Sequence, residues 1–85
     1  MSKEWLITFR SVTYAQRAQE ILRSSHMPCR IHRTPKYLAQ RGCGYCLRLQ
    51  EEDALIGVEL LHQAQMPYEK LYEIQKDGSV RERML

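Results

Sequence analysis

Two cysteines separated by two residues, Cys43 and Cys46, are the side chains of this chain best suited to chemistry. In a reducing compartment the Cys-x-x-Cys spacing serves thiol redox reactions, soft-metal binding or sulfur transfer. Gly42 and Gly44 flank Cys43 and would let a partner approach its backbone closely. We therefore expect Cys43 to be the reactive thiol, with Cys46 as a candidate second thiol.

The cysteine pair lies in a stretch of chain whose charged residues are all basic. No Asp or Glu occurs between Ile21 and Gln50, whereas Lys and Arg occur at Arg23, Arg30, Arg33, Lys36, Arg41 and Arg48. Positive charge near a thiol favours the thiolate, which is the reactive form. We expect Lys36, Arg41 and Arg48 to support Cys43. The same stretch could instead be an ordinary solvated face, or could bind an anion, an acidic partner or nucleic acid.

Other kinds of site have weaker support in the sequence. A structural zinc site usually takes four Cys or His ligands in two pairs, and no second pair with ligand spacing accompanies Cys43 and Cys46. Neither a Ser-His-Asp arrangement nor a phosphate-binding Gly-rich loop is visible. We expect no resident metal and no enzymatic activity.

The length and the cysteine count suggest a small cytosolic protein. A chain of 85 residues is enough for one domain. No apolar run approaches the ~20 residues that span a bilayer, and the first residues do not have a signal-peptide layout. Three cysteines, an odd number, argue against a secreted disulfide framework. We expect a cytoplasmic protein without membrane contact, with one domain over residues 1–78 and a charged tail over 79–85.

Local patterns predict the elements that must position the cysteines. Aromatic and β-branched residues predict four strands, over residues 5–9, 29–32, 44–49 and 68–74. Apolar residues at helical spacing predict a helix that ends before Met27-Pro28 and another, starting at Glu51, that ends before Met66-Pro67. The predicted order is therefore β-α-β-β-α-β.

That order predicts an α+β fold, a ferredoxin-like two-layer sandwich with two helices on one face of an antiparallel sheet. The helical stripes predict which side chains face the sheet: Ala18, Ile21, Leu22, Val58 and Leu61. In the third strand, alternation places Cys46 and Arg48 on the face opposite Tyr45, Leu47 and Leu49.

Several short motifs resemble a known family. They are Ile7-Thr8-Phe9-Arg10-Ser11-Val12-Thr13, Thr34-Pro35-Lys36, and Gly42-Cys43-Gly44 followed by Leu47-Arg48-Leu49. Over most of its length the chain resembles the small prokaryotic domains of unknown function described as selenium/sulfur carrier-like proteins. The resemblance implies that Cys43 is the key cysteine. Lys36 stands where the family commonly has Arg, and Cys46 stands where a small apolar residue is expected.

Three functional hypotheses follow. In the first, the protein is a non-enzymatic carrier that exchanges sulfur or selenium with donor and acceptor proteins. Cys43 holds the atom as a persulfide or selenosulfide, and Lys36, Arg41 and Arg48 stabilise the anion.

In the second, the protein is an RNA-binding module, because Arg41-Gly42-Cys43-Gly44-Tyr45 and the element order are similar to the RNA-recognition motif. Cys43 takes the place of a stacking aromatic in that motif. In the third, the protein is a thiol redox or regulatory domain, although redox motifs normally begin a helix and this one begins a strand.

Overall fold

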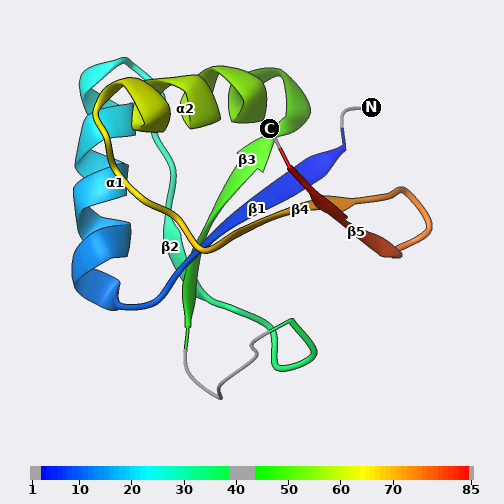
Figure 1. Cartoon of the computed structure of the whole chain (residues 1–85). Coiled ribbons are helices and arrows are strands. Elements are labelled where there is room, and N and C mark those ends of the chain that lie inside the picture. The colour runs from blue at the N-terminus through cyan, green and yellow to red at the C-terminus, as the bar shows by residue number, and fades with distance from the viewer. Residues whose placement is uncertain (1–2, 39–43, 85) are drawn as a thin grey trace.

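The computed structural model describes residues 3–38 and 44–84. These residues form β1 (Glu4–Phe9), α1 (Val12–Ser24), β2 (Ile31–Arg33), β3 (Tyr45–Gln50), α2 (Glu51–Gln63), β4 (Lys70–Ile74) and β5 (Val80–Arg83). The strands pair antiparallel in the order β2-β3-β1-β4-β5, and both helices lie on the same side of the sheet (Figure 1). The predicted α+β class is confirmed, with two helices over one face of an antiparallel sheet.

The sheet differs from the predicted four-stranded ferredoxin-like sandwich because it has a fifth strand. Strand β5 lies within residues 79–85, which the sequence predicted to be a charged tail. Its sequence, Val-Arg-Glu-Arg, has one apolar residue and therefore no alternation that would predict a strand. A turn centred on Gly78, whose φ is +89°, returns the chain beside β4. The predicted order β-α-β-β-α-β therefore holds for the first six elements, and β5 is added after β4 at the edge of the sheet.

Ionic contacts hold β5 against the rest of the sheet. The carboxylate of Glu73 on β4 is almost fully buried and binds Lys3 Nζ at 3.3 Å, Arg83 Nη1 at 3.0 Å and Gln75 Nε2 at 2.9 Å. Burial alone would raise the pKa of Glu73, but these donors outweigh it and hold the pKa below its ordinary value. On the other face, Lys70 pairs with Glu82 of β5 at 3.1 Å.

The helices start where local capping predicts them. The Ser11 side chain accepts a hydrogen bond from Tyr14 N at the start of α1. The three acidic residues Glu51, Glu52 and Asp53 occupy the first turn of α2, where the helix dipole favours negative charge. After each helix one residue has a left-handed backbone conformation: His26, with φ 60°, after α1, and Gln65, with φ 54°, after α2. The next residue in each case, Met27 or Met66, is buried in the core.

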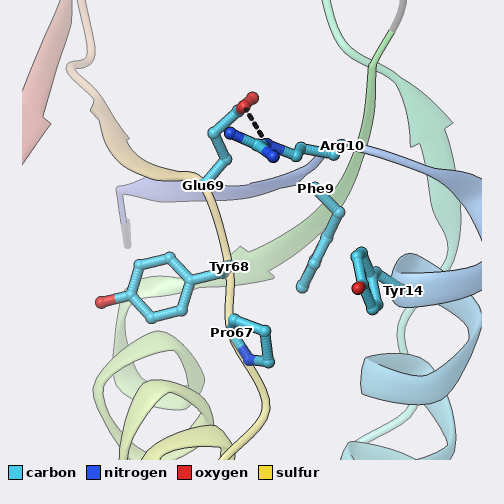
Figure 2. A pocket seen from close by; sticks show the side chains of 6 residues that line it. All are labelled: Phe9, Arg10, Tyr14, Pro67, Tyr68 and Glu69. Atoms are coloured by element: carbon cyan, nitrogen blue, oxygen red, sulfur yellow. Dashed lines mark ion pairs between the residues drawn. The ribbon is translucent and has the colours of Figure 1, made fainter.

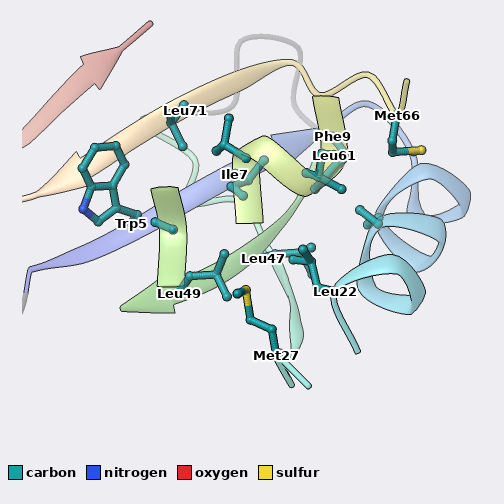
Figure 3. Packing of buried hydrophobic residues seen from close by; sticks show 14 residues of the cluster. Trp5, Ile7, Phe9, Leu22, Met27, Leu47, Leu49, Leu61, Met66 and Leu71 are labelled. Atoms are coloured by element: carbon teal, nitrogen blue, oxygen red, sulfur yellow. The ribbon is translucent and has the colours of Figure 1, made fainter. Parts of the chain in front are cut away.

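The main core lies between the sheet and the helices (Figure 3). The alternate residues Trp5, Ile7 and Phe9 of β1 are buried there, together with Leu47 and Leu49 of β3. The five predicted helical residues also face this core: four are fully buried, and Ile21 is half-buried against it. The helical stripe therefore predicted these contacts correctly.

A smaller cluster covers part of the opposite face of the sheet, which we call the open face. It consists of Leu6, Cys46 and Tyr72, with Leu38, Ile74 and Val80 packed around them. Leu38 arrives from the β2–β3 connection through a turn in which its N–H donates to the Pro35 carbonyl at 2.9 Å. The predicted alternation of β3 is confirmed, because Cys46 is in this cluster whereas Leu47 and Leu49 are in the main core.

Candidate functional site

The predicted site lies at the β2–β3 connection, and the structure describes part of it. Arg41, Gly42 and Cys43 lie outside the described residues. A hydrogen bond joins the two ends of this connection: the N–H of Thr34 donates to the carbonyl of Gly44 at 3.0 Å. Gly44 directly follows Cys43 in the chain. The pairing of Thr34 with Gly44 therefore fixes the point from which β3 starts.

Close packing explains why glycine stands at position 44. A Cβ built on Gly44 would lie 3.3 Å from Thr34 Oγ1, 3.6 Å from Thr34 Cβ and 3.7 Å from the Phe9 carbonyl oxygen. The Thr34 hydroxyl is buried and makes no hydrogen bond of ordinary geometry within residues 3–38 and 44–84. The Thr34–Gly44 corner thus places the Thr34 hydroxyl beside the chain position that follows Cys43, and close to the Cys46 thiol.

Cys46 is placed next to this corner, on the open face. Its side chain is 1% exposed, and its Sγ lies 4.0 Å from the carbonyl oxygen of Arg33. Burial raises the pKa of the Cys46 thiol, and the nearby Thr34 hydroxyl and Arg48 guanidinium offset this only in part. Cys46 therefore forms a thiolate less readily than an ordinary cysteine does, and reagents reach it poorly.

Cys29 has a similar but less enclosed environment. It is half-buried against the main core just before β2, and its carbonyl accepts a hydrogen bond from Gln19 Nε2 at 2.8 Å. Burial raises the pKa of its thiol, while the positive charge of Arg23 acts in the opposite direction. Both cysteines in the described part of the chain are thus disfavoured as thiolates.

Two of the predicted supporting cations are described, and they differ in their contacts. Arg48 lies on the open face two residues from Cys46, and its Nη2 binds Glu4 Oε1 at 2.6 Å. Lys36 is exposed in the turn of the β2–β3 connection and makes no ion pair with the described residues. The structure therefore places Arg48 on the same face as Cys46. The positive charge of Arg48 is partly neutralised there by the carboxylate of Glu4.

Sequence reasoning missed the contributions of Thr34 and Glu4. Thr34 faces Gly44 because β2 and β3 pair in one particular register, and Glu4 reaches Arg48 from the neighbouring strand. No local sequence pattern predicts either the contact of Thr34 with Gly44 or that of Glu4 with Arg48. The only hint was that Thr34 belongs to one of the short motifs quoted above.

The aromatic residues of β1 are unsuited to stacking with bases. Trp5 and Phe9 are buried under the helices, and the centre of the open face consists of Leu6, Cys46 and Tyr72. Base stacking in an RNA-recognition motif requires exposed aromatic rings on the open face. The described strands do not provide such rings at these positions.

Two further findings concern metals and membranes. Within residues 3–38 and 44–84, no three His, Cys, Asp or Glu side chains are grouped so that they could hold a metal ion. Neither helix in the described part of the chain is long and apolar enough to cross a membrane.

Comparison with known proteins gives one match. A family model described as "putative Se/S carrier protein-like" matches residues 4–73. No curated protein and no solved structure matches the chain significantly. The matched span runs from the first residue of β1 into β4 and includes the β2–β3 connection with Cys43. Because it covers most of the 85 residues, the chain belongs to the putative Se/S carrier protein-like family.

Proposed function

We propose that this protein carries sulfur or selenium on the thiol of Cys43, as a persulfide or a selenosulfide. The family description supports this chemistry. The observation that carries the choice of cysteine is the burial of the other two, because burial raises the pKa of both Cys29 and Cys46. A carrier needs a thiolate that can attack a donor, and thiolate formation is disfavoured at these two positions.

Loading would be an exchange with a persulfide, or with its selenium counterpart, on a donor protein or small molecule. The Cys43 thiolate attacks the terminal sulfur or selenium atom, and a new S–S or S–Se bond forms. The bond between that atom and the donor sulfur breaks, and its electron pair leaves with the donor as a thiolate. An acceptor thiolate unloads the atom by the same step. The exchange has no net oxidation or reduction, so it requires only a donor, an acceptor and one accessible thiolate.

Cations near Cys43 would stabilise both its thiolate and the persulfide anion. Lys36, Arg41 and Arg48 are the proposed contributors, in the stretch without acidic residues. Of the two described, Lys36 has no ionic partner within residues 3–38 and 44–84, whereas Arg48 is already paired with Glu4. We therefore assign the larger effect to Lys36. The proposal also includes a cytoplasmic location, because reducing conditions keep such thiols free.

The test is the intact mass of the protein after anaerobic incubation with a low-molecular-weight persulfide. The expected product is a reductant-labile addition of one sulfur atom in the wild type and in the Cys29→Ser and Cys46→Ala variants. The Cys43→Ser variant should gain none. Peptide mapping after alkylation then locates the modified residue. If the Cys43→Ser variant gains as much sulfur as the wild type, the proposal is wrong. It is also wrong if the sulfur added to the wild type is found on Cys29 alone.

A further inference from the structure

Strand β2 forms one edge of the sheet, and among the described strands it pairs with β3 alone (Figure 1). In an antiparallel ladder, residues alternate between bonding to the neighbouring strand and pointing away from it. Because the N–H of Thr34 donates to the Gly44 carbonyl, this alternation directs the backbone groups of Ile31 and Arg33 away from β3. The N–H groups of Ile31 and Arg33 make no hydrogen bond with the described residues. The outer edge of β2 is thus open to pairing with a further strand.

The side chains along this edge carry positive charge without a carboxylate. Arg30 and Arg33 are exposed, and neither makes an ion pair within the part of the chain that the structure describes. The guanidinium carbon of Arg33 lies 5.7 Å from the centre of the Tyr45 ring, a cation–π contact that holds this charge beside the edge. The whole strand lies in the stretch from Ile21 to Gln50, which has no Asp or Glu. An approaching segment therefore meets positive charge here.

Charged residues in other parts of the fold are more evenly mixed. At the end of β1, Arg10 Nε lies 3.4 Å from Glu69 Oε2 (Figure 2). At the opposite edge of the sheet, β5 has the sequence Val-Arg-Glu-Arg, and its Glu82 pairs with Lys70 at 3.1 Å. The β5 edge therefore presents both signs of charge, whereas the β2 edge presents only positive charge.

The charge and the backbone geometry together indicate which occupant suits the β2 edge. A second copy of β2 would bring Arg30 and Arg33 of both chains together, and like charges on paired strands destabilise the pairing. Nucleic acid would be attracted by the positive charge, but it has no alternating N–H and C=O groups with which Ile31 and Arg33 could form a ladder. An acidic polypeptide in an extended conformation satisfies both the charge and the backbone groups.

We propose that the outer edge of β2 binds an acidic, extended segment of a partner protein, which joins the sheet as an additional strand. The main chain of the segment pairs with the backbone of Ile31 and Arg33. Its carboxylates lie beside Arg30 and Arg33, and an apolar side chain suits the position next to Ile31, which is half-buried against the main core. The ladder requires an extended main chain and the guanidinium groups require acidic side chains, so the edge selects for both features. The proposal does not depend on the chemistry of Cys43.

The test is an NMR titration of the full chain with a short capped peptide of alternating glutamate and valine, observed at the backbone amides. Saturable shifts are expected. At saturation, hydrogen exchange at the N–H groups of Ile31 and Arg33 should slow at least about tenfold, because each gains a hydrogen bond. By the same alternation, Val80 and Glu82 direct their N–H groups to the outer side of β5, and their exchange should not change. The absence of saturable binding would overturn the proposal, as would equal protection at β5.

Two matched peptides separate the effect of charge from that of strand formation. Lysine in place of glutamate reverses the charge, whereas proline in place of valine keeps the charge and prevents a continuous ladder. Both should bind at least about tenfold more weakly than the glutamate–valine peptide. If the glutamate–proline peptide binds equally well, the edge is a charged surface and does not accept a strand. The proposal is also wrong if single-stranded oligouridine binds more tightly than the peptide and leaves the exchange of Ile31 and Arg33 unchanged.

Charge reversal at the edge provides a second measurement. The double variant Arg30→Glu/Arg33→Glu should weaken binding of the glutamate–valine peptide about tenfold or more and strengthen that of the lysine–valine peptide, because attractive pairs become repulsive. The control double variant Arg17→Glu/Arg81→Glu makes the same charge change at exposed positions on α1 and β5, and should bind like the wild type. An equal loss in both double variants would refute a specific role for the β2 edge. The Cys43→Ser variant should bind the peptide normally, so a failure of the carrier function and a failure of this proposal are distinguishable.

Discussion

Replacing Gly44 by alanine is expected to destabilise the protein because the added methyl group meets a side chain that cannot move away. The new Cβ would lie 3.3 Å from Thr34 Oγ1, which is tighter than most Cβ contacts and requires Thr34 to shift by a few tenths of an ångström. Thr34 is nine-tenths buried, and its own N–H is bonded to the Gly44 carbonyl. Overpacking costs about 1–3 kcal/mol, and replacing Gly by Ala returns about 0.4–1 kcal/mol through the unfolded state. The free energy of unfolding should fall by roughly 1 kcal/mol in a urea titration.

A second substitution at Thr34 tests the cause. Thr34→Ala removes Oγ1, and the remaining contacts of the Gly44→Ala methyl group, at 3.6 and 3.7 Å, are ordinary. In that background Gly44→Ala should stabilise the protein by about 0.4–1 kcal/mol. Thr34→Val serves as the matched control, because it keeps an atom at the Oγ1 position and should retain the penalty. If Gly44→Ala has the same effect in all three backgrounds, the steric reasoning about this corner is wrong.

Three other perturbations have outcomes that follow from the burial and charges described above. Competitive alkylation at neutral pH should label Cys43 before Cys46, and peptide mapping that finds Cys46 labelled first would contradict the assignment of the reactive thiol. Lys36→Ala should raise the apparent pKa of Cys43, measured by pH-dependent alkylation, by more than Arg48→Ala does. High salt should reduce this difference from the wild type. If the alkylation profile is unchanged in both variants, the basic stretch is an ordinary solvated face. The lowered pKa of Glu73 stabilises the fold above the unfolded-state pKa of about 4.3, and this contribution is lost as the pH falls through the lower folded-state pKa. In urea titrations at a series of acid pH values, Glu73→Gln should therefore flatten the loss of stability, and parallel curves would show that Glu73 does not contribute to it.

Much of the architecture could be predicted from local patterns, because helix and strand periodicity are properties of neighbouring residues. The stripe that includes Leu22 and Leu61 indicated which helix faces are buried, and the alternation in β3 placed Cys46 opposite Leu47. Strand β5 was not predicted because three of its four residues are charged, so it has no alternation of apolar and polar residues. It is held by pairing with β4 and by ionic contacts such as that of Glu73, which no local pattern encodes.

For the candidate site, the amino-acid sequence by itself determined the cysteine spacing, the acid-free stretch and the motifs shared with the family. The tertiary structure decided how each group is surrounded. The pKa of the Cys46 thiol is raised because Leu6, Tyr72 and Leu38 pack around it, and these residues come from three different segments of the chain. Burial, and with it the pKa of a thiol, depends on contacts between segments far apart in sequence, so only the packed sheet could show that Cys46 is a shielded cysteine.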